Sequence, residues 1–420
     1  MIFTRPMYLG DTYWYVLDIK NSFGHGWIDF SKLWDFPHLL WRPIGRILSD
    51  VFLPLILGRF HQNAGTSITF LLVCLNVLAA LICGLVVQAA AWRLTGNQWA
   101  ATLAGAAFLC VSSVLNYSRS GSSYVVGLAF LLIALYLAAF YRNRSWKEAV
   151  LCGFLSGMAV LVWVPYLVSV PAVFMAGPVL NVDERSDHQR SLRYVALAGL
   201  ATGVIVAGFY MMAIAIQHIH TVPALLRWIH ETSHDPERSR KLIRMAMGFP
   251  RSVYELGDDA LWIKWFLFRD PYAKVGLLEL LRVPLLKLVA FYATLSGLAI
   301  ALWRSPVMGR RLFLLIVIAM IPNLGMALMY ESGSPERYLP FLPLVFIGFG
   351  YVLGNRAFSR EARIALSLLC CAHIPVDLYL LSAATVNRNL DSAAYNIAEL
   401  ASLPPGSHVF VINGFDVAPN

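Results

Sequence analysis

The sequence predicts an all-α, polytopic membrane protein with about ten transmembrane helices. The first observation is its composition, because 58% of the 420 residues are hydrophobic and only 14% are charged, whereas soluble domains are about 25% charged. The second is a series of apolar runs that are long enough, or nearly long enough, to span a bilayer. The third is the uneven distribution of arginine and lysine between the loops. The formal net charge of +9 therefore reflects membrane orientation and gives no indication of nucleic-acid binding.

Residues 1–66 precede the first apolar run. The stretch 31–57 is amphipathic and contains prolines at positions 37, 43 and 54, so no uninterrupted span fits within it. Such a segment lies along the membrane surface, and its tryptophans suit that depth. We therefore expect interfacial helices in this first loop. Residues 1–30 lack the basic and apolar regions of a signal peptide.

The ten apolar runs follow from residue 67 onward. They lie at about 67–92, 99–116, 122–141, 148–164, 166–180, 194–217, 284–303, 312–330, 338–355 and 364–381. The pair around Val164-Pro165 forms either one kinked helix or two short ones, because proline removes a backbone hydrogen-bond donor.

Arginine and lysine are concentrated in one set of alternate loops. That set contains thirteen of them: Arg93, Arg142, Arg144, Lys147, Arg185, Arg190, Arg193, Arg304, Arg310, Arg311, Arg356, Arg360 and Arg363. The opposite set of short loops contains Arg119 and Arg337 only. By the positive-inside rule, the arginine-rich loops are cytoplasmic. The rule also favours two crossings within residues 148–180, because a single crossing would invert every later loop.

This orientation divides the chain into five parts. They are an outer-face loop with interfacial helices (1–66), an N-terminal transmembrane bundle (67–217), a second outer-face loop (218–283), a C-terminal transmembrane bundle (284–381) and an outer-face tail (382–420). We expect a bacterial inner-membrane protein whose outer loops are periplasmic. Translocation of a 66-residue N-terminal segment without a preceding helix is unusual, so we also expect a first transmembrane helix to be missing from this chain.

The second outer loop and the tail carry little chemical signal. The longest apolar piece of the loop, 260–268, is too short to span a bilayer. His230, His234 and Asp235 lack the HExxH spacing of a zinc site, so a capped surface helix is favoured. The segment 403–416 reads as a turn and an apolar strand, which indicates the start of a small, truncated outer-face domain. All six cysteines lie within apolar runs, so no disulfide framework or metal site is indicated.

Three short motifs resemble those of the C-type (GT-C) glycosyltransferases, which are multi-spanning membrane enzymes that use polyprenyl-phosphate-linked sugars. GDTYWY (10–15) places an acid at the head of the first outer loop, and DFPHLLWRPIG (35–45) resembles the HLL…P.G stretch of some bacterial members. GSPERYLPFLPLVFIGFGYVL (333–353) is similar to the segment that begins a late helix of that superfamily. In topology the resemblance covers most of the chain, and it extends to bacterial proteins of the dolichyl-phosphate-mannose-protein mannosyltransferase kind.

The sequence departs from the family pattern at Asp11. Many members carry two adjacent or nearly adjacent acids in the first loop, whereas Asp11 is followed by Thr12 and Tyr13. The resemblance therefore gives only weak support to a divalent cation, and we assign no metal ligand and no other cofactor.

The resemblance implies sugar transfer from a polyprenyl-phosphate-linked donor, held with membrane lipid, to a glycan, lipid or protein acceptor at the periplasmic face. The lipid phosphate or pyrophosphate leaves without needing a proton from the enzyme. The site must therefore supply a base for the acceptor hydroxyl and positive charge for the departing phosphate. Asp11 is the candidate catalytic base, because a carboxylate at the membrane boundary is partly desolvated. Its alternative is a solvent-exposed acid at a helix end.

The candidate substrate-binding residues come from all three motifs. They are Trp14, Asp35, His38, Arg42, Glu336, Arg337 and Tyr338. The two arginines are candidate phosphate ligands, because a guanidinium group binds phosphate with two parallel hydrogen bonds. The two aromatic residues are candidates for stacking on a sugar, although aromatic residues at this depth are usually interfacial anchors.

Three of these candidates have specific structural alternatives. Asp35 equally suits capping the turn before Pro37. His38 is either a polar anchor, a phosphate ligand or a group that orients Asp11. Arg337 could instead form an ion pair with Glu336 or Glu331, which are close in sequence. Asp18, seven residues after Asp11, is expected on the same helical face.

Two other functional classes remain open at the level of sequence. A transporter or flippase of lipid or sugar would show internal repeats and charged or helix-breaking residues near the middle of its spans. The predicted spans are almost free of charge there and show no repeat, and the main exceptions, His373 and Asp377, lie toward the outer end of the last span. A non-catalytic membrane partner is supported only by the missing second acid.

Overall fold

The structure is a computed structural model that describes residues 11–26, 31–60, 64–140, 145–180, 188–231, 241–256 and 283–386. Within these ranges all regular secondary structure is helical, as predicted. The predicted strand in 403–416, the apolar piece 260–268 and the pair His234 and Asp235 lie outside the described residues.

The described residues between positions 11 and 60, where interfacial helices were predicted, form several helices before the long helix that follows. These elements are α1 (Thr12–Asn21), η1 (Ser22–Gly24), η2 (Ser31–Leu33), η3 (Phe36–His38) and α2 (Trp41–Phe60). The N-terminal bundle contains α3 (Ala64–Thr95), α4 (Gln98–Leu109), α5 (Ser112–Ser118), α6 (Tyr124–Phe140), α7 (Trp146–Val162), η4 (Val164–Ser169), α8 (Val170–Leu180) and α9 (His188–Ile216).

The rest of the described chain forms two helices in the loop 218–283 and the C-terminal bundle. The loop helices are α10 (Val222–Glu231) and α11 (Lys241–Val253). The bundle contains α13 (Pro284–Arg304), α14 (Val307–Met329), η7 (Pro335–Tyr338), α15 (Leu342–Gly354), α16 (Arg360–Cys371) and α17 (His373–Val386).

Every apolar run predicted from the sequence falls on a helix, and the chain is an integral membrane protein. In the described ranges, five helical stretches are long and apolar enough to cross a bilayer: α3, residues 191–216 of α9, α13, α14, and residues 360–380 of α16 and α17. Three apolar stretches are shorter, namely α6, residues 164–180 and α15.

Interruptions in two apolar regions bear on the predictions. One settles whether residues 148–180 form one helix or two, and the other corrects the single span predicted for 99–116. Residues 148–180 form two helices, because Trp163 is extended and a 3₁₀ segment precedes α8. The run 99–116, predicted as one span, is instead bent by 62° between α4 and α5. Val111 has an extended backbone at this bend, and the hydroxyl of Ser113 donates to the carbonyl of Ser252, which draws α5 toward the outer-loop segment.

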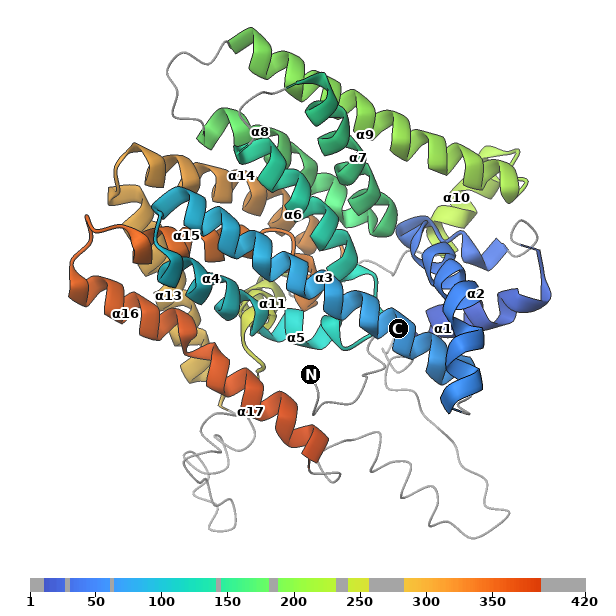
Figure 1. Cartoon of the computed structure of the whole chain (residues 1–420), viewed down its shortest axis with the longest axis horizontal. Helices are drawn as coiled ribbons and strands as arrows, with labels where there is room; N and C mark the ends of the chain where they lie inside the picture. Colours follow the sequence, from blue (N-terminus) through green and yellow to red (C-terminus); the bar gives the residue numbers. More distant parts are fainter. Residues whose placement is uncertain are drawn as a thin grey trace.

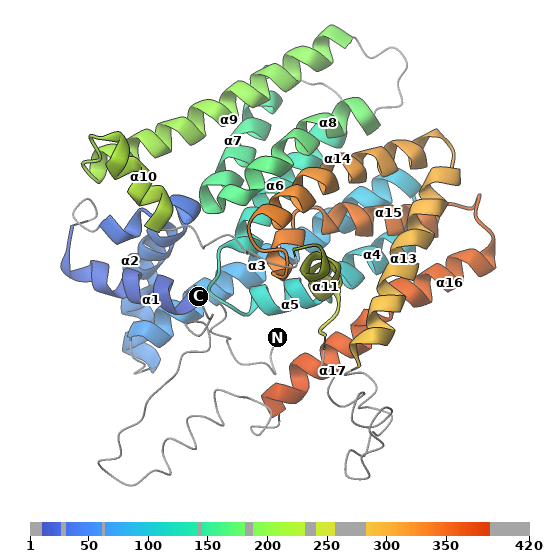
Figure 2. The same ribbon diagram turned by 180° about the vertical axis from the view of Figure 1, so that it is seen from behind.

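Helix α3 runs the length of the bundle, and different elements pack against its two ends. Its 32 residues span about 48 Å at the usual rise per residue. Near its beginning, Leu72 lies against Gly45 of α2, whereas near its end Ala91 lies against Gly350 of α15. Figures 1 and 2 show α1, α2 and α10 gathered around the end where α3 begins, away from the start of α16. The segments that carry the first motif therefore lie together at one end of the molecule.

The polar residues of the last span attach it to its neighbours. His373 and Asp377 are fully buried. The ring nitrogens of His373 lie 2.7 Å from the carbonyl oxygen of Cys370 and 2.9 Å from that of Ala107. The backbone N–H of Glu255 donates to Asp377 Oδ1 at 2.6 Å. Both residues thus connect α17 to its neighbours, His373 to α4 and Asp377 to Glu255.

Candidate functional site

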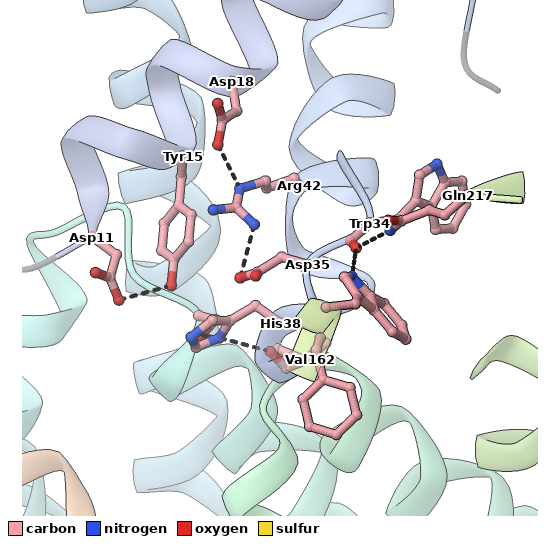
Figure 3. A network of polar contacts seen from close by, with 12 residues as sticks. Asp11, Tyr15, Asp18, Trp34, Asp35, His38, Arg42, Val162 and Gln217 are labelled. Carbon is pink, nitrogen blue, oxygen red and sulfur yellow. Dashed lines mark hydrogen bonds and ion pairs between the residues drawn. The ribbon is translucent and has the colours of Figure 1, made fainter. Parts of the chain in front are cut away.

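Asp11 stands at the N-cap position of α1, half-buried. Its side chain makes no capping hydrogen bond. Instead, the hydroxyl of Tyr15, one helical turn later, donates to Asp11 Oδ2 at 3.1 Å (Figure 3). Tyr15 is buried, and burial raises the pKa of its hydroxyl, so the group keeps its proton and remains a donor. The tyrosine therefore fixes the direction of the carboxylate.

The beginning of α1 is held against the segment that joins α5 to α6. The backbone N–H of Gly121 donates to the hydroxyl of Thr12 at 3.1 Å, and the indole of Trp41 donates to the carbonyl of Gly121 at 2.9 Å. Close packing requires a glycine here, because an added Cβ would lie 2.8 Å from the Thr12 methyl group. This glycine thus ties α1 and α2 to the same point of the bundle.

Arg42 lies between two carboxylates from different elements (Figure 3). Its Nη1 is 2.8 Å from Asp35 Oδ2, and its Nε is 3.1 Å from Asp18 Oδ2. The Nε–H does not point at the Asp18 oxygen, so this second contact is an ion pair without a hydrogen bond. The guanidinium group also lies 5.0 Å from the ring centre of Tyr15.

Asp35 is therefore ion-paired with Arg42. It stands at the N-cap position of η3, yet its side chain makes no capping hydrogen bond, so the predicted capping role is not observed. Burial raises the pKa of Asp35 and of Asp18, while Arg42 acts in the opposite direction on both. Arg42 thus stabilises two carboxylates that would otherwise be costly to bury.

His38 connects the outer loop to the membrane helices. It is buried, and its Nδ1 lies 2.8 Å from Ser123 Oγ and 3.4 Å from the carbonyl oxygen of Val162. Two residues further on, the N–H of Leu40 donates to the carbonyl of Leu161 at 3.0 Å. The ring edge of His38 also packs on Tyr15, the residue that holds Asp11, with ring centres 5.4 Å apart.

A continuous set of aromatic side chains extends from His38 into the bundle, and we call it the aromatic wall. Ring centres are 6.1 Å apart between His38 and Tyr124, 4.7 Å between Tyr124 and Trp163, and 4.8 Å between Tyr124 and Tyr117. At the far side of the wall, the hydroxyl of Tyr117 donates to Glu336. The wall therefore links the motif 35–45, which contains His38, to the motif at residues 333–353.

Glu336 and Arg337 have different surroundings within η7. Glu336 is buried, and burial raises its pKa. Arg337 pairs with Glu331 through Nη2 at 2.8 Å, while its guanidinium carbon lies 5.5 Å from the ring centre of Trp163. The alternative ion pair predicted with Glu331 is thus present. The Nε of Arg337 makes no hydrogen bond within the described part of the chain.

The two aromatic candidates occupy opposite environments. Trp14 is 58% exposed on α1 and contacts Tyr13 edge to face. Tyr338 is 0% exposed, stacks on Phe249 and donates its hydroxyl to the carbonyl of Ser332. Tyr338 therefore has no ring face open to a sugar in this structure, because the packing of α11 against η7 covers it. Trp14 alone keeps the exposure that stacking requires.

The candidate site also contains residues that were not predicted from the sequence. Tyr15 follows Asp11 by four positions, so helical spacing alone would have placed the two together. Tyr117, Tyr124 and Trp163 carried no comparable signal, since their meeting depends on the bend after α4 and the break after α7. In the described ranges, no group of three or more histidine, cysteine, aspartate or glutamate side chains is arranged to hold a metal ion.

Comparisons with known proteins identify the fold. No family model and no curated protein sequence matches the chain. Solved structures do match over nearly its whole length at low sequence identity, and they show that the chain has the GT-C fold predicted from the three motifs.

One protein of known structure to which the chain is similar is ArnT from Cupriavidus metallidurans. The apo structure of ArnT has a TM-score of 0.57 at 14% sequence identity and covers 97% of this chain and 78% of that chain. The ArnT structure bound to undecaprenyl phosphate has a TM-score of 0.55 at 13% identity, covering 98% and 79%. An oligosaccharyltransferase from Archaeoglobus fulgidus also matches, with a TM-score of 0.48 at 13% identity, covering 91% of this chain and 52% of that chain.

Proposed function

We propose that the protein is an integral-membrane glycosyltransferase that transfers a sugar from a polyprenyl-phosphate-linked donor to an acceptor on the periplasmic face. The observation that carries the proposal is the fold shared with ArnT over 98% of this chain, in a solved structure that contains undecaprenyl phosphate. The carboxylate of Asp11, which accepts a hydrogen bond from Tyr15 at the edge of the membrane bundle, supports the proposal further.

Asp11 acts as the general base in this proposal. Its carboxylate accepts the proton of the acceptor hydroxyl while that oxygen attacks the anomeric carbon of the donor sugar. The bond between the anomeric carbon and the phosphate oxygen breaks, and its electron pair leaves with the lipid phosphate. Tyr15 keeps Asp11 oriented, since it holds Oδ2 by a hydrogen bond.

The departing phosphate needs a positive charge nearby. The two candidate arginines differ in how many carboxylates already neutralise their charge. Arg42 forms salt bridges with two carboxylates, whereas Arg337 forms one, with Glu331; the Nε of each arginine makes no hydrogen bond in the described part of the chain. The aromatic wall runs from His38, which packs on Tyr15 beside Asp11, to Trp163, whose ring lies next to the guanidinium group of Arg337. We therefore assign phosphate binding to Arg337 and a positioning role to Arg42.

Asp11→Asn tests the proposal directly. The purified protein, reconstituted in lipid, is incubated with a panel of polyprenyl-phosphate sugars, and glycan, lipid and peptide products are analysed by mass spectrometry. General-base catalysis contributes about 10²- to 10⁴-fold to rate, so the variant should lose transfer by about that factor.

Asp50→Asn is the matched control. Asp50 is an exposed aspartate on α2 that pairs with Arg46 in the same helix, and its variant should keep normal turnover. Normal turnover by Asp11→Asn would remove Asp11 from the mechanism. Absence of transfer by the wild-type protein from every donor in the panel would count against a glycosyltransferase altogether.

A further inference from the structure

A groove of about 520 Å³ lies at the end of the bundle opposite Asp11. Helix α4 forms one wall, and α16, together with the end of α15, forms the other. The side chains that matter here are Trp99 and Leu103 of α4, Leu353 of α15, and Arg360, Arg363 and Ile364 of α16. None of these residues takes part in the site described above.

The groove combines two guanidinium groups with apolar walls. Arg360 is exposed, whereas Arg363 is half-buried and reaches the carbonyl of Leu353 through Nη1 at 3.4 Å. The Nε of Arg363 is buried and makes no hydrogen bond within the described ranges. Glu361 is the acid beside them, and it is fully exposed and accepts hydrogen bonds at the start of α16, including one from Ser359. Two guanidinium groups one helical turn apart in the groove lining suit an anion with several acceptor oxygens.

We propose that this groove binds an anionic phospholipid. The phosphate contacts Arg360 and Arg363, and the acyl chain lies along Leu103, Leu353 and Ile364. Trp99, at 85% exposure, stands where an indole ring meets the headgroup region of a bilayer. Basic pockets between transmembrane helices on the cytoplasmic side are suited to acidic headgroups. The apolar walls distinguish such a lipid from a free phosphate ion, which would bind to the arginines alone.

Thermal unfolding in detergent, after extensive delipidation, tests the proposal. Phosphatidylglycerol should raise the Tm of the wild-type protein, whereas phosphatidylcholine and inorganic phosphate at equal concentration should not. In the double variant Arg360→Gln/Arg363→Gln, the apparent Kd for phosphatidylglycerol should rise at least about tenfold, as expected for loss of charge-assisted contacts. Native mass spectrometry of the same samples should show fewer retained phosphatidylglycerol molecules.

Two further variants keep the test decisive. Arg304→Gln/Arg356→Gln removes the same charge from two exposed arginines that lie outside the groove, and its phosphatidylglycerol response should match the wild type. Ala106→Trp fills the groove without changing charge and should weaken the response. Equal losses in both double variants, an unchanged response in Arg360→Gln/Arg363→Gln, or an equal effect of inorganic phosphate would overturn the proposal. Sugar transfer is not measured, so the result is independent of the proposed activity.

Discussion

Arg42 shows how one cation organises the first outer loop at the residue scale. It contacts Asp18 of α1 and Asp35 before η3 while covering the ring of Tyr15. All three partners come from segments that precede it in the chain. Removal of a single member of such a buried cluster leaves the remaining charges uncompensated, which costs about 3–5 kcal/mol.

Arg42→Gln should therefore destabilise the protein, and the loss should depend on pH. Without the guanidinium group, the raised pKa values of Asp35 and Asp18 rise further. A carboxyl with a raised pKa in the folded state contributes stability that is present below its unfolded pKa of about 3.9 and is lost as pH rises through the folded value. The fall in Tm relative to wild type should thus be largest near neutral pH and shrink as pH falls toward that window.

Two comparisons isolate the effect of Arg42. Lys20→Gln removes an exposed cation from α1 and should leave Tm nearly unchanged at every pH. Arg42→Gln/Asp35→Asn removes one of the stranded charges and should recover part of the loss. A fall in Tm that is equal at all pH values would contradict the electrostatic explanation. Tryptophan fluorescence during heating provides the measurement.

The candidate site was only partly predictable from single residues. Asp11, Asp35, His38 and Arg42 stand in two short motifs near the start of the chain, so sequence proximity brought them together before the fold was known. The role of Tyr338 was not predictable, because the packing of Phe249 against its ring arises from a helix about ninety residues earlier in the chain.

At the scale of elements, α7 and α9 pack through small residues. Gly153 of α7 lies so close to α9 that an added Cβ would be 2.4 Å from the carbonyl oxygen of Ala198. Thr202 Oγ1, from α9, lies 2.9 Å from the carbonyl oxygen of Gly153. Gly157, four positions later, faces Ile205. Such glycine spacing lets transmembrane helix backbones approach closely.

Gly153→Ala should destabilise the bundle. The added methyl group must push α9 away, and overpacking of this kind costs about 1–3 kcal/mol. Gly203→Ala is the matched control, because no atom lies within 4 Å of an added Cβ at that position on α9. The control should be neutral or slightly stabilising, since alanine favours helix. Equal Tm values for the two variants would show that the close approach at Gly153 does not limit stability.

Helix positions followed from hydropathy, but their interruptions did not. The bend between α4 and α5 contains no proline, and it depends on hydroxyl groups that bond to residues far along the chain, as Ser113 does to Ser252. Hydropathy detects whether a segment is apolar, and a segment can stay apolar while its axis turns by 62°. Such a turn is specified by tertiary contacts, which one sequence does not display.

At the scale of the whole molecule, α3 places the two candidate sites at opposite ends. Arg93 lies in its last turn and Arg304 in the last turn of α13, whereas α1 and α2 pack near the beginning of α3 (Figure 1). The proposed sugar-transfer site and the lipid groove are therefore expected in different membrane leaflets.

Reporter fusions measure this orientation. Alkaline phosphatase fused after His220 should be active, because that position is expected outside the cytoplasm. A green fluorescent protein fused after Arg356 should fluoresce, because that loop is expected inside. Exchange of the two reporters provides the control, since each should then be silent. The opposite pattern would contradict a periplasmic site for Asp11.

Pro165 has a consequence for how substrates reach Asp11. Lacking an N–H, it cannot bond to the carbonyl of Leu161, and Leu40 of the first loop supplies the missing donor. In surroundings with little water, separation of these groups would leave both unsatisfied. This backbone hydrogen bond, together with the contacts of His38, holds the segment 38–40 against the end of α7. In the proposed reaction, a long-chain donor would therefore reach Asp11 past a segment that is bonded to the bundle, and the shape of that segment would contribute to the choice of donor.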